Sequence, residues 1–464
     1  MIGAALSRWT LSYFAASLAF LIIGVGMMAG GFGYPFHGIR APETLILVHI
    51  IAIGWLALLM SGALLQFVPV LVAKPLWGSS AQLPALLLLL SGLIGLLLGF
   101  AGMVGLPEDT IALLPISGLL LIAGFSLIVL MLGVTIWKAR PISLPTRFVA
   151  VGIGCLLIVA GLGGLYTFVL SGATEQIIAL EIAGSTVSIH AALALGGWMT
   201  FTAMGVSYRL LTMFMLSPDS NTKRTRLLWW LGLAALTILS FSITVFAFGI
   251  GQPAIALSIA LVPAIACIAL YALDVRAIYR QRKRKAIELN SMASISAFAA
   301  LLISMVLALT MLWTGVTDQM VAALVYLFVF GWLSGLSLAQ LYKIVPFLTW
   351  LECYGPVMGR VQTPRVQDMV REQNARHWFI LYYGSVWFCT LALIFNHLTI
   401  FRLSSALSLI AILALSVHFF RARRLLDVPT NLRLPNGVIL PNLIHAGAPV
   451  LKARRVLSQP GDTL

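Results

Sequence analysis

The sequence predicts an all-α polytopic membrane protein with twelve transmembrane helices in three pseudo-symmetric groups of four. Three observations lead to this prediction. Of the 464 residues, 61% are hydrophobic and only 9% are charged, apolar stretches of about 20 residues recur along most of the chain, and one motif occurs three times at near-equal spacing. A soluble globular chain is rarely this apolar. We therefore expect the lipid bilayer to be the main partner of the protein.

Each apolar stretch is long enough to cross the hydrocarbon core of a bilayer as a helix. The stretches lie near residues 11–31, 44–73, 82–103, 110–137, 147–171, 184–216, 226–249, 253–279, 292–315, 319–350, 377–398 and 400–420. Division into three gives repeat units at 10–140, 147–280 and 290–422, followed by a tail at 423–464. The chain 1–464 is then a single membrane domain, because no loop is long enough for a separate soluble one.

The basic residues support this count independently. If the amino terminus is cytoplasmic, every Lys and Arg except Arg40 and Arg402 falls in or beside an inner segment. This asymmetry follows the positive-inside rule, and one missed or invented helix would destroy it. We therefore expect a multi-pass protein of a bacterial-type cytoplasmic (inner) membrane with both termini in the cytoplasm. The net charge of +15 is then a topology signal, and no nucleic-acid partner is expected.

The repeated motif lies on the second helix of each group. In every copy a Gly-Trp pair is followed by a small residue, a polar residue and then Pro or Thr, at fixed distances from the Trp. These positions share one stripe of a helix, so the motif predicts a helix-packing unit. The three copies are Gly54-Trp55 with Gly62, Gln66 and Pro69; Gly197-Trp198 with Gly205, Arg209 and Thr212; and Gly331-Trp332 with Ala339, Lys343 and Pro346.

The polar position of the motif is occupied by Gln66, Arg209 and Lys343. All three are expected on the inner half of their helices. Long basic side chains there can extend to the cytoplasmic surface, which is a sufficient explanation for Arg209 and Lys343. The functional alternative is an inner polar entrance for protons or for an anionic substrate.

Two histidines in the outer halves of the motif helices are the candidate ligands. His49 lies six residues before Trp55, and His190 lies eight residues before Trp198. An ionisable side chain in a transmembrane segment is costly unless it is paired or coordinated, and imidazole is a common metal and heme ligand. The alternative is a neutral histidine that is hydrogen-bonded to a backbone carbonyl or a hydroxyl on a neighbouring helix.

The two histidines are not equivalent within the repeat. In a regular α-helix, which turns by about 100° per residue, they would point about 160° apart after superposition of the copies. The residue that matches His49 is Ala192 in the second copy and Tyr326 in the third. The candidates for a second shell around the site are Tyr326, His37 in the first outer loop and His397 at the outer end of the eleventh helix. His37 and His397 also fit solvated interfacial positions.

These features together resemble the heme-copper oxidase superfamily. Its subunit I has twelve helices in three groups of four and carries a low-spin heme ligand on its second helix. The matching stretch here is His49-Ile-Ile-Ala-Ile-Gly54-Trp55, followed by Gly62 and Pro69. A closer resemblance is to the NnrS-like branch of heme-containing membrane proteins, which is associated with nitric oxide stress. That resemblance is carried by Leu47-Val48-His49 with Pro69, and by His190-Ala-Ala-Leu with Gly196, Gly197 and Tyr208-Arg209.

The resemblance implies heme as the cofactor, with His49 as an axial ligand and His190 as a second heme ligand or part of a depleted metal site. It implies the handling of a small diatomic gas such as nitric oxide, or electron transfer. Residues 319–350 contain no histidine where this superfamily has two heme ligands, and residues 226–249 contain none where it has a His pair. Copper stays possible, but its usual ligand set is absent, and proton-pumping oxygen reduction is not expected. A heme-dependent oxidoreductase activity stays open, as does a partner subunit or homo-oligomer. The alternatives are a twelve-helix secondary transporter and a non-catalytic assembly or structural membrane protein.

Overall fold

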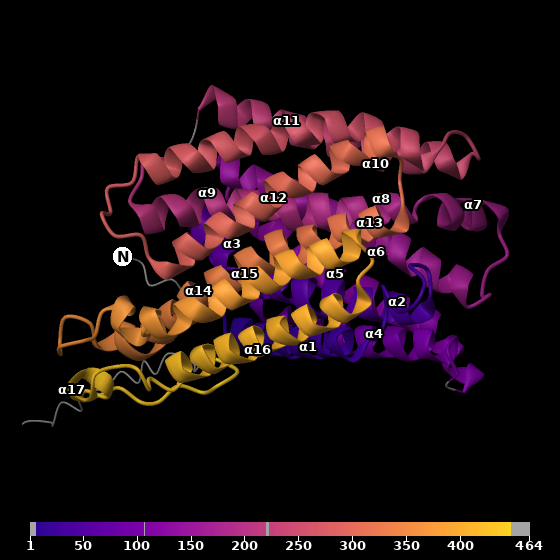
Figure 1. Cartoon of the computed structure of the whole chain (residues 1–464). Coiled ribbons are helices and arrows are strands. Elements are labelled where there is room, and N and C mark those ends of the chain that lie inside the picture. Colours follow the sequence, from indigo (N-terminus) through magenta and orange to yellow (C-terminus); the bar gives the residue numbers. More distant parts are fainter. Residues whose placement is uncertain (1–5, 106, 220–221, 447–464) are drawn as a thin grey trace, which may run out of the picture.

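The computed structural model describes residues 6–105, 107–219 and 222–446, and the twelve expected membrane-spanning helices are all found in this part of the chain. Figure 1 shows the long helices side by side in one bundle, with α17 at one end. We call this the terminal end and the opposite one the distal end. The spans begin and end close to the expected positions. Several start earlier than their apolar stretch, as at Lys223 and Glu372, because polar residues at a membrane interface can continue a helix.

The helices of the bundle have the following bounds: α1 (Thr10–Gly30), α2 (Pro42–His49), η1 (Ile50–Ala57), α3 (Leu58–Val72), η2 (Ser79–Ala81), α4 (Gln82–Gly102), η3 (Glu108–Ala112), α5 (Leu113–Trp137), α6 (Leu144–Leu170), α7 (Ile177–Ser185), α8 (Val187–Ala192), η4 (Leu193–Phe201), α9 (Thr202–Met215), α10 (Lys223–Ala247), α11 (Pro253–Arg280), α12 (Leu289–Thr314), α13 (Asp318–Tyr326), η5 (Leu327–Ser334), α14 (Gly335–Tyr354), η6 (Gly355–Val357), η7 (Val366–Met369), α15 (Glu372–Ile394), α16 (Leu398–Arg423) and α17 (Thr430–Arg433). The second, sixth and tenth spans are each assembled from several of these pieces.

Each of the three motif helices contains a π-helix, which the sequence analysis did not anticipate. The π-helices are η1, η4 and η5, and each begins directly after the residue equivalent to His49 and includes the Gly-Trp pair. A π-helix has i→i+5 hydrogen bonds and turns by less per residue than an α-helix, and it is rare outside functional or strained sites. The sequence-based angle between His49 and His190 assumed a regular α-helix, and that assumption is wrong for both segments.

The glycines of the motif bring each motif helix against the preceding span. The π-helices η1, η4 and η5 pack on α1, α6 and α12, respectively. A Cβ added at Gly54 would lie 2.6 Å from Phe20 Cγ, one at Gly197 would lie 2.6 Å from Cys155 Sγ, and one at Gly331 would lie 2.7 Å from Ala300 Cβ. The expected close approach of helices at these small residues is therefore confirmed, and it follows the same pattern in all three copies.

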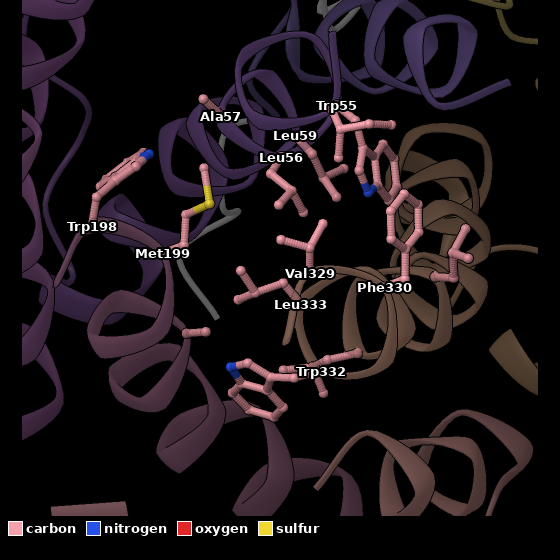
Figure 2. Close-up of a cluster of buried hydrophobic side chains, with 14 of the residues drawn as sticks. Trp55, Leu56, Ala57, Leu59, Trp198, Met199, Val329, Phe330, Trp332 and Leu333 are labelled. Atoms are coloured by element: carbon pink, nitrogen blue, oxygen red, sulfur yellow. The ribbon is translucent and has the colours of Figure 1, made fainter. Parts of the chain in front are cut away.

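The three motif tryptophans meet in one buried cluster, which we call the tryptophan junction (Figure 2). Trp55, Trp198 and Trp332 are each at most 1% exposed. Trp55 Nε1 donates a hydrogen bond to Ser334 Oγ at 2.9 Å, and Trp332 Nε1 donates to Thr200 Oγ1 at 3.1 Å. The side chains therefore link the first motif helix to the third, and the third to the second.

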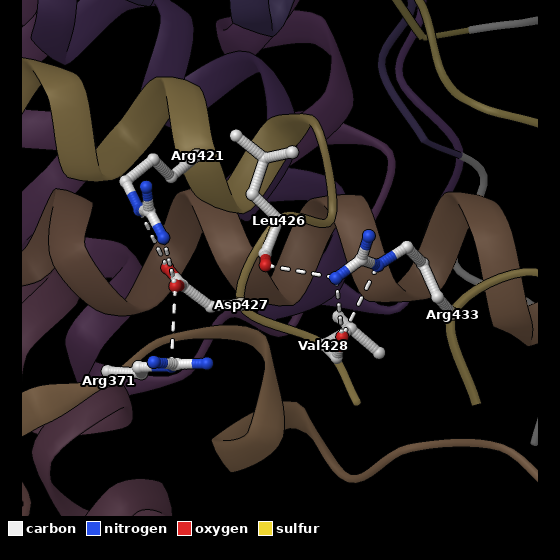
Figure 3. A network of polar contacts seen from close by, with 6 residues as sticks. All are labelled: Arg371, Arg421, Leu426, Asp427, Val428 and Arg433. Atoms are coloured by element: carbon white, nitrogen blue, oxygen red, sulfur yellow. Dashed lines mark hydrogen bonds and ion pairs between the residues drawn. The ribbon is translucent and has the colours of Figure 1, made fainter. Parts of the chain in front are cut away.

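The segment that follows α16 is fastened to the terminal end of the bundle by arginines (Figure 3). Asp427 is almost fully buried and lies 2.7 Å from Arg421 Nη2 and 3.6 Å from Arg371 Nε of the α15 N-cap. Arg433 Nη2 donates to the carbonyls of Leu426 and Val428, both at 3.1 Å. The described part of the expected tail, up to residue 446, thus packs against the membrane helices.

The close helix contact at Gly205 gives a direct test of the packing. A Cβ at this position would lie 2.6 Å from Phe148 Cβ and 2.7 Å from the backbone carbonyl oxygen of Pro145, which cannot rotate away. We expect Gly205→Ala to lower the free energy of unfolding by about 1–3 kcal/mol, because overpacking forces the two helices apart. Gly161→Ala on α6 is the matched control, since nothing lies within 4 Å of its added Cβ. Equal thermal stability of the two purified variants would contradict the packing.

Candidate functional site

His49 is the last residue of α2, directly before the π-helix η1. Its Nδ1 lies 2.7 Å from the carbonyl oxygen of Leu45. Because a carbonyl can only accept, Nδ1 carries the proton, and Nε2 is left with its lone pair available. The imidazole is half-buried and packs against the ring of Phe100 on α4, with ring centroids 5.2 Å apart. This hydrogen bond to a backbone carbonyl is the arrangement that orients metal-ligating histidines.

His190 lies on the short helix α8, upstream of η4. Its half-buried ring packs edge-on against Tyr166 of α6, with ring centroids 5.3 Å apart. The Tyr166 hydroxyl is engaged with Thr186 Oγ1 at 2.8 Å. His190 Nδ1 is buried, and among the described residues it has no hydrogen-bond partner. A buried polar atom without a partner is uncommon and points to a ligand or an ordered water.

His49 and His190 belong to the second and the sixth membrane span, respectively. The two imidazoles are close enough to interact electrostatically, although they belong to different spans. Contacts of α3 with α6 bring the first motif helix beside the span that carries Tyr166. The opposite orientations that a regular α-helix would give to the two rings therefore do not separate them in the folded chain.

Tyr326 occupies the position of His49 in the third motif helix but faces other neighbours. Its ring stacks on Phe330 at 4.6 Å and packs edge-on against Phe401 at 5.7 Å. Its hydroxyl lies near Cys389 and Ser408 of α15 and α16. Tyr326 thus contributes to the packing of α13 against α15 and α16, and its role in a second shell stays a prediction.

His37 and His397 are placed at the distal surface. His37 Nε2 lies 3.7 Å from Glu43 Oε1, and its Nδ1 lies 3.4 Å from the Gly33 carbonyl oxygen. His397 is exposed at the N-cap of α16. In the described contacts, neither ring touches His49 or His190, so a second-shell role for them also stays a prediction.

The donors that the site offers are two imidazoles, His49 and His190. In the described part of the chain, no group of three or more His, Cys, Asp or Glu side chains could hold a metal. A bare transition-metal ion usually needs three or four protein ligands, whereas a heme brings its own equatorial nitrogens and needs only one or two axial ones. His49 with a free Nε2 lone pair and His190 with an unpartnered Nδ1 fit the second requirement.

The polar position of the motif is used differently in each copy. Gln66 is buried, and its Oε1 accepts a hydrogen bond from the backbone N–H of Ser7 at 2.7 Å. Arg209 is exposed and lies 4.0 Å from the exposed Asp219, as expected for a side chain that extends to the surface. Lys343 is mostly buried, and its Nζ lies 2.7 Å from Glu288 Oε2. These three residues do not form a common site.

Glu288 is the centre of a charged cluster that the sequence analysis missed. It is paired with Lys343 and Arg284, and Gln367 Nε2 donates to its Oε1 at 2.9 Å. Burial alone would raise the pKa of the Glu288 carboxyl, but the hydrogen bonds from Lys343 and Gln367 and the two positive charges hold that pKa below its ordinary value of 4.5. Arg284 is four residues away, but Lys343 and Gln367 come from distant parts of the chain, so no local motif reveals the whole cluster.

Asp274 in α11 is a second buried carboxylate that the sequence analysis missed. It is 1% exposed and forms an ion pair with Arg224. Its Oδ2 accepts hydrogen bonds from Tyr208 Oη at 2.8 Å and from Thr225 Oγ1 at 2.9 Å. Because all these contacts satisfy the carboxylate, Asp274 is best explained as a link between α9, α10 and α11 near the terminal end.

The lowered pKa of Glu288 predicts a pH-dependent contribution to stability. A carboxyl with a lowered pKa stabilises the fold above its unfolded-state pKa and loses that effect as the pH falls through its folded-state pKa. At pH 7 we expect Glu288→Gln to cost about 1–3 kcal/mol, less than for a fully buried pair because Arg284 keeps contact with water. The difference from wild type should shrink below pH 4.5. Melting temperatures of both proteins between pH 7 and pH 3 test this.

The exposed Glu181 on α7 provides the control for that series. Glu181→Gln should leave the melting temperature within experimental error of wild type across the same pH range. If the difference in melting temperature between wild type and Glu288→Gln did not depend on pH, the charge of the carboxyl would contribute nothing to stability.

Comparison with known sequences gives no further assignment. The chain matches none of the protein-family models and none of the curated proteins. The resemblance to the heme-copper oxidase superfamily therefore rests on the short motifs around His49 and His190. The function has to be argued from the site itself.

Proposed function

We propose that the chain is a heme-binding integral membrane protein that resembles a degenerate heme-copper oxidase subunit I, closest to the NnrS-like branch. The observation that carries this proposal is the pair of half-buried imidazoles, His49 and His190, which approach each other from different units. His49 would provide an axial ligand through Nε2. His190 would provide a second heme ligand or belong to a depleted metal site, one that has lost some of its usual ligands.

The chain's own residues prepare His49 for this role. The hydrogen bond from Nδ1 to the Leu45 carbonyl fixes the tautomer and the orientation of the ring, and it makes Nε2 a better electron donor. Phe100 and Tyr166 pack against the two imidazoles and limit their rotation. A bound heme would supply an iron centre for electron transfer or for binding a small diatomic gas such as nitric oxide. We do not assign a proton-pumping oxygen reductase activity.

We also infer that the twelve helices form three pseudo-symmetric groups of four, over 10–140, 147–280 and 290–422. The repeated elements support this division. Each unit has a π-helix at the same motif position, and each π-helix packs on the first span of its own unit through a motif glycine. A secondary transporter is less well supported, because such carriers usually contain two-fold or inverted repeats.

The location proposed for the protein is a bacterial-type inner membrane with both termini in the cytoplasm. The distal end carries Arg40, in the loop before α2, and Arg402, at the start of α16. The other basic residues in the described part of the chain lie towards the terminal end. This distribution supports a cytoplasmic terminal end by the positive-inside rule.

A reduced-minus-oxidised absorption spectrum of the purified protein tests the proposal. We expect heme Soret and α bands in the wild type and their loss in His49→Ala, because the axial ligand is removed. His377→Ala, which removes an exposed histidine near the start of α15, should keep the spectrum unchanged. In His190→Ala, a change from a low-spin to a high-spin spectrum would identify His190 as the second axial ligand.

Two results would argue against heme binding. A colourless protein that takes up no heme on reconstitution would favour the non-catalytic membrane protein. A spectrum that is the same in wild type, His49→Ala and His190→Ala would place any bound heme elsewhere.

A further inference from the structure

In the tryptophan junction, two of the three indoles donate a hydrogen bond to an equivalent position of another motif helix. Trp55 donates to Ser334, which lies two residues after Trp332, and Trp332 donates to Thr200, which lies two residues after Trp198. Each indole thus bonds to the hydroxyl that stands two positions after the tryptophan of the next motif helix. The third bond of this cycle would run from Trp198 to the residue two positions after Trp55. That residue is Ala57, which has no hydroxyl.

Trp198 is therefore the motif tryptophan whose indole N–H lacks this acceptor. Its side chain is 1% exposed, and among the described residues nothing accepts a hydrogen bond from its Nε1. Figure 2 shows Ala57 in the same buried cluster, on the side to which the Trp198 nitrogen is turned. An indole N–H that is buried without an acceptor is costly, and most such groups in proteins bind protein atoms or ordered water.

The backbone beside Ala57 offers a second partner for a small molecule. Ala57 is the last residue of the π-helix η1, and the next N–H, that of Leu58, bonds to the Ile53 carbonyl in the i→i+5 pattern. Where i→i+5 bonding returns to i→i+4 bonding, the turn contains one more carbonyl than it has amide donors. A molecule that accepts from Trp198 and donates to this surplus carbonyl would satisfy both groups.

We propose that Trp198 Nε1 binds a single water molecule, which takes the place of the hydroxyl that Ala57 lacks. Water is the smallest molecule that both accepts and donates, and buried water typically satisfies groups of this kind. The site lies in the core of the bundle and is independent of the proposed heme. It makes the junction asymmetric, with two direct side-chain bonds and one that is bridged by water.

Nuclear magnetic resonance of the full-length protein in micelles, with 15N-labelled indoles, tests the proposal. The Trp198 signal is assigned by its disappearance in Trp198→Phe, or by its shift in Met199→Leu if the first variant does not fold. We expect a magnetisation-transfer cross-peak from the Trp198 N–H to water, and none for Trp55 or Trp332. In Ala57→Ser the serine hydroxyl should displace the water and abolish the cross-peak.

Thermal stability provides an independent readout. Ala57→Ser should raise the melting temperature by about 1–3 °C, because a direct bond replaces one that immobilises water. Ala339→Ser is the matched control, since it adds the same hydroxyl at a fully buried alanine of the third motif helix and should not raise the melting temperature. A wild-type Trp198 without a water cross-peak, or with one that persists in Ala57→Ser, would overturn the proposal.

Discussion

The requirement that every buried polar group find a partner inside the bundle is the constraint on which the rest of the structure depends. Hydrocarbon offers no hydrogen bonds, so a tryptophan that faces the core must donate to another helix or to a bound molecule. Trp55 and Trp332 do so through Ser334 and Thr200. These bonds fix the relative register of the three motif helices, because each hydroxyl must lie opposite the indole of a different span.

The helix count and the packing glycines could be predicted from the sequence because both depend on local composition. Apolar length gives the spans, and a Gly such as Gly205 indicates a close helix contact before its neighbour is known. The π-helices could not be predicted, because the amino acids of η1 are equally compatible with an α-helix. Tertiary contacts must offset the free-energy cost of the π-helices, and those contacts depend on residues that are distant in the sequence.

The candidate site could likewise be predicted only in part from the sequence. His49 was found because a histidine in an apolar stretch is unusual, and the partner of its Nδ1 is only four residues away at Leu45. The position of His190 relative to His49 could not be derived, since it depends on how the first two motif helices pack and on the π-helical turns within each of them. Glu288 was missed for a related reason, because Lys343 and Gln367 join it only in the folded chain.

The packing positions of the motif recur in all three copies, whereas its polar and ionisable residues differ between copies, and this contrast has a physical reason. Packing positions such as Gly54 must be kept in each copy, because a side chain there would collide with the preceding span. Positions on the inner surface of the junction are freer, since a lost hydroxyl costs at most one hydrogen bond when water can replace it. Ala57 occupies such a position on the first motif helix, and His49 lies directly before the π-helix that ends at Ala57. We therefore expect specialisation to concentrate on that helix and on its contact with the second motif helix, where His190 and Trp198 lie.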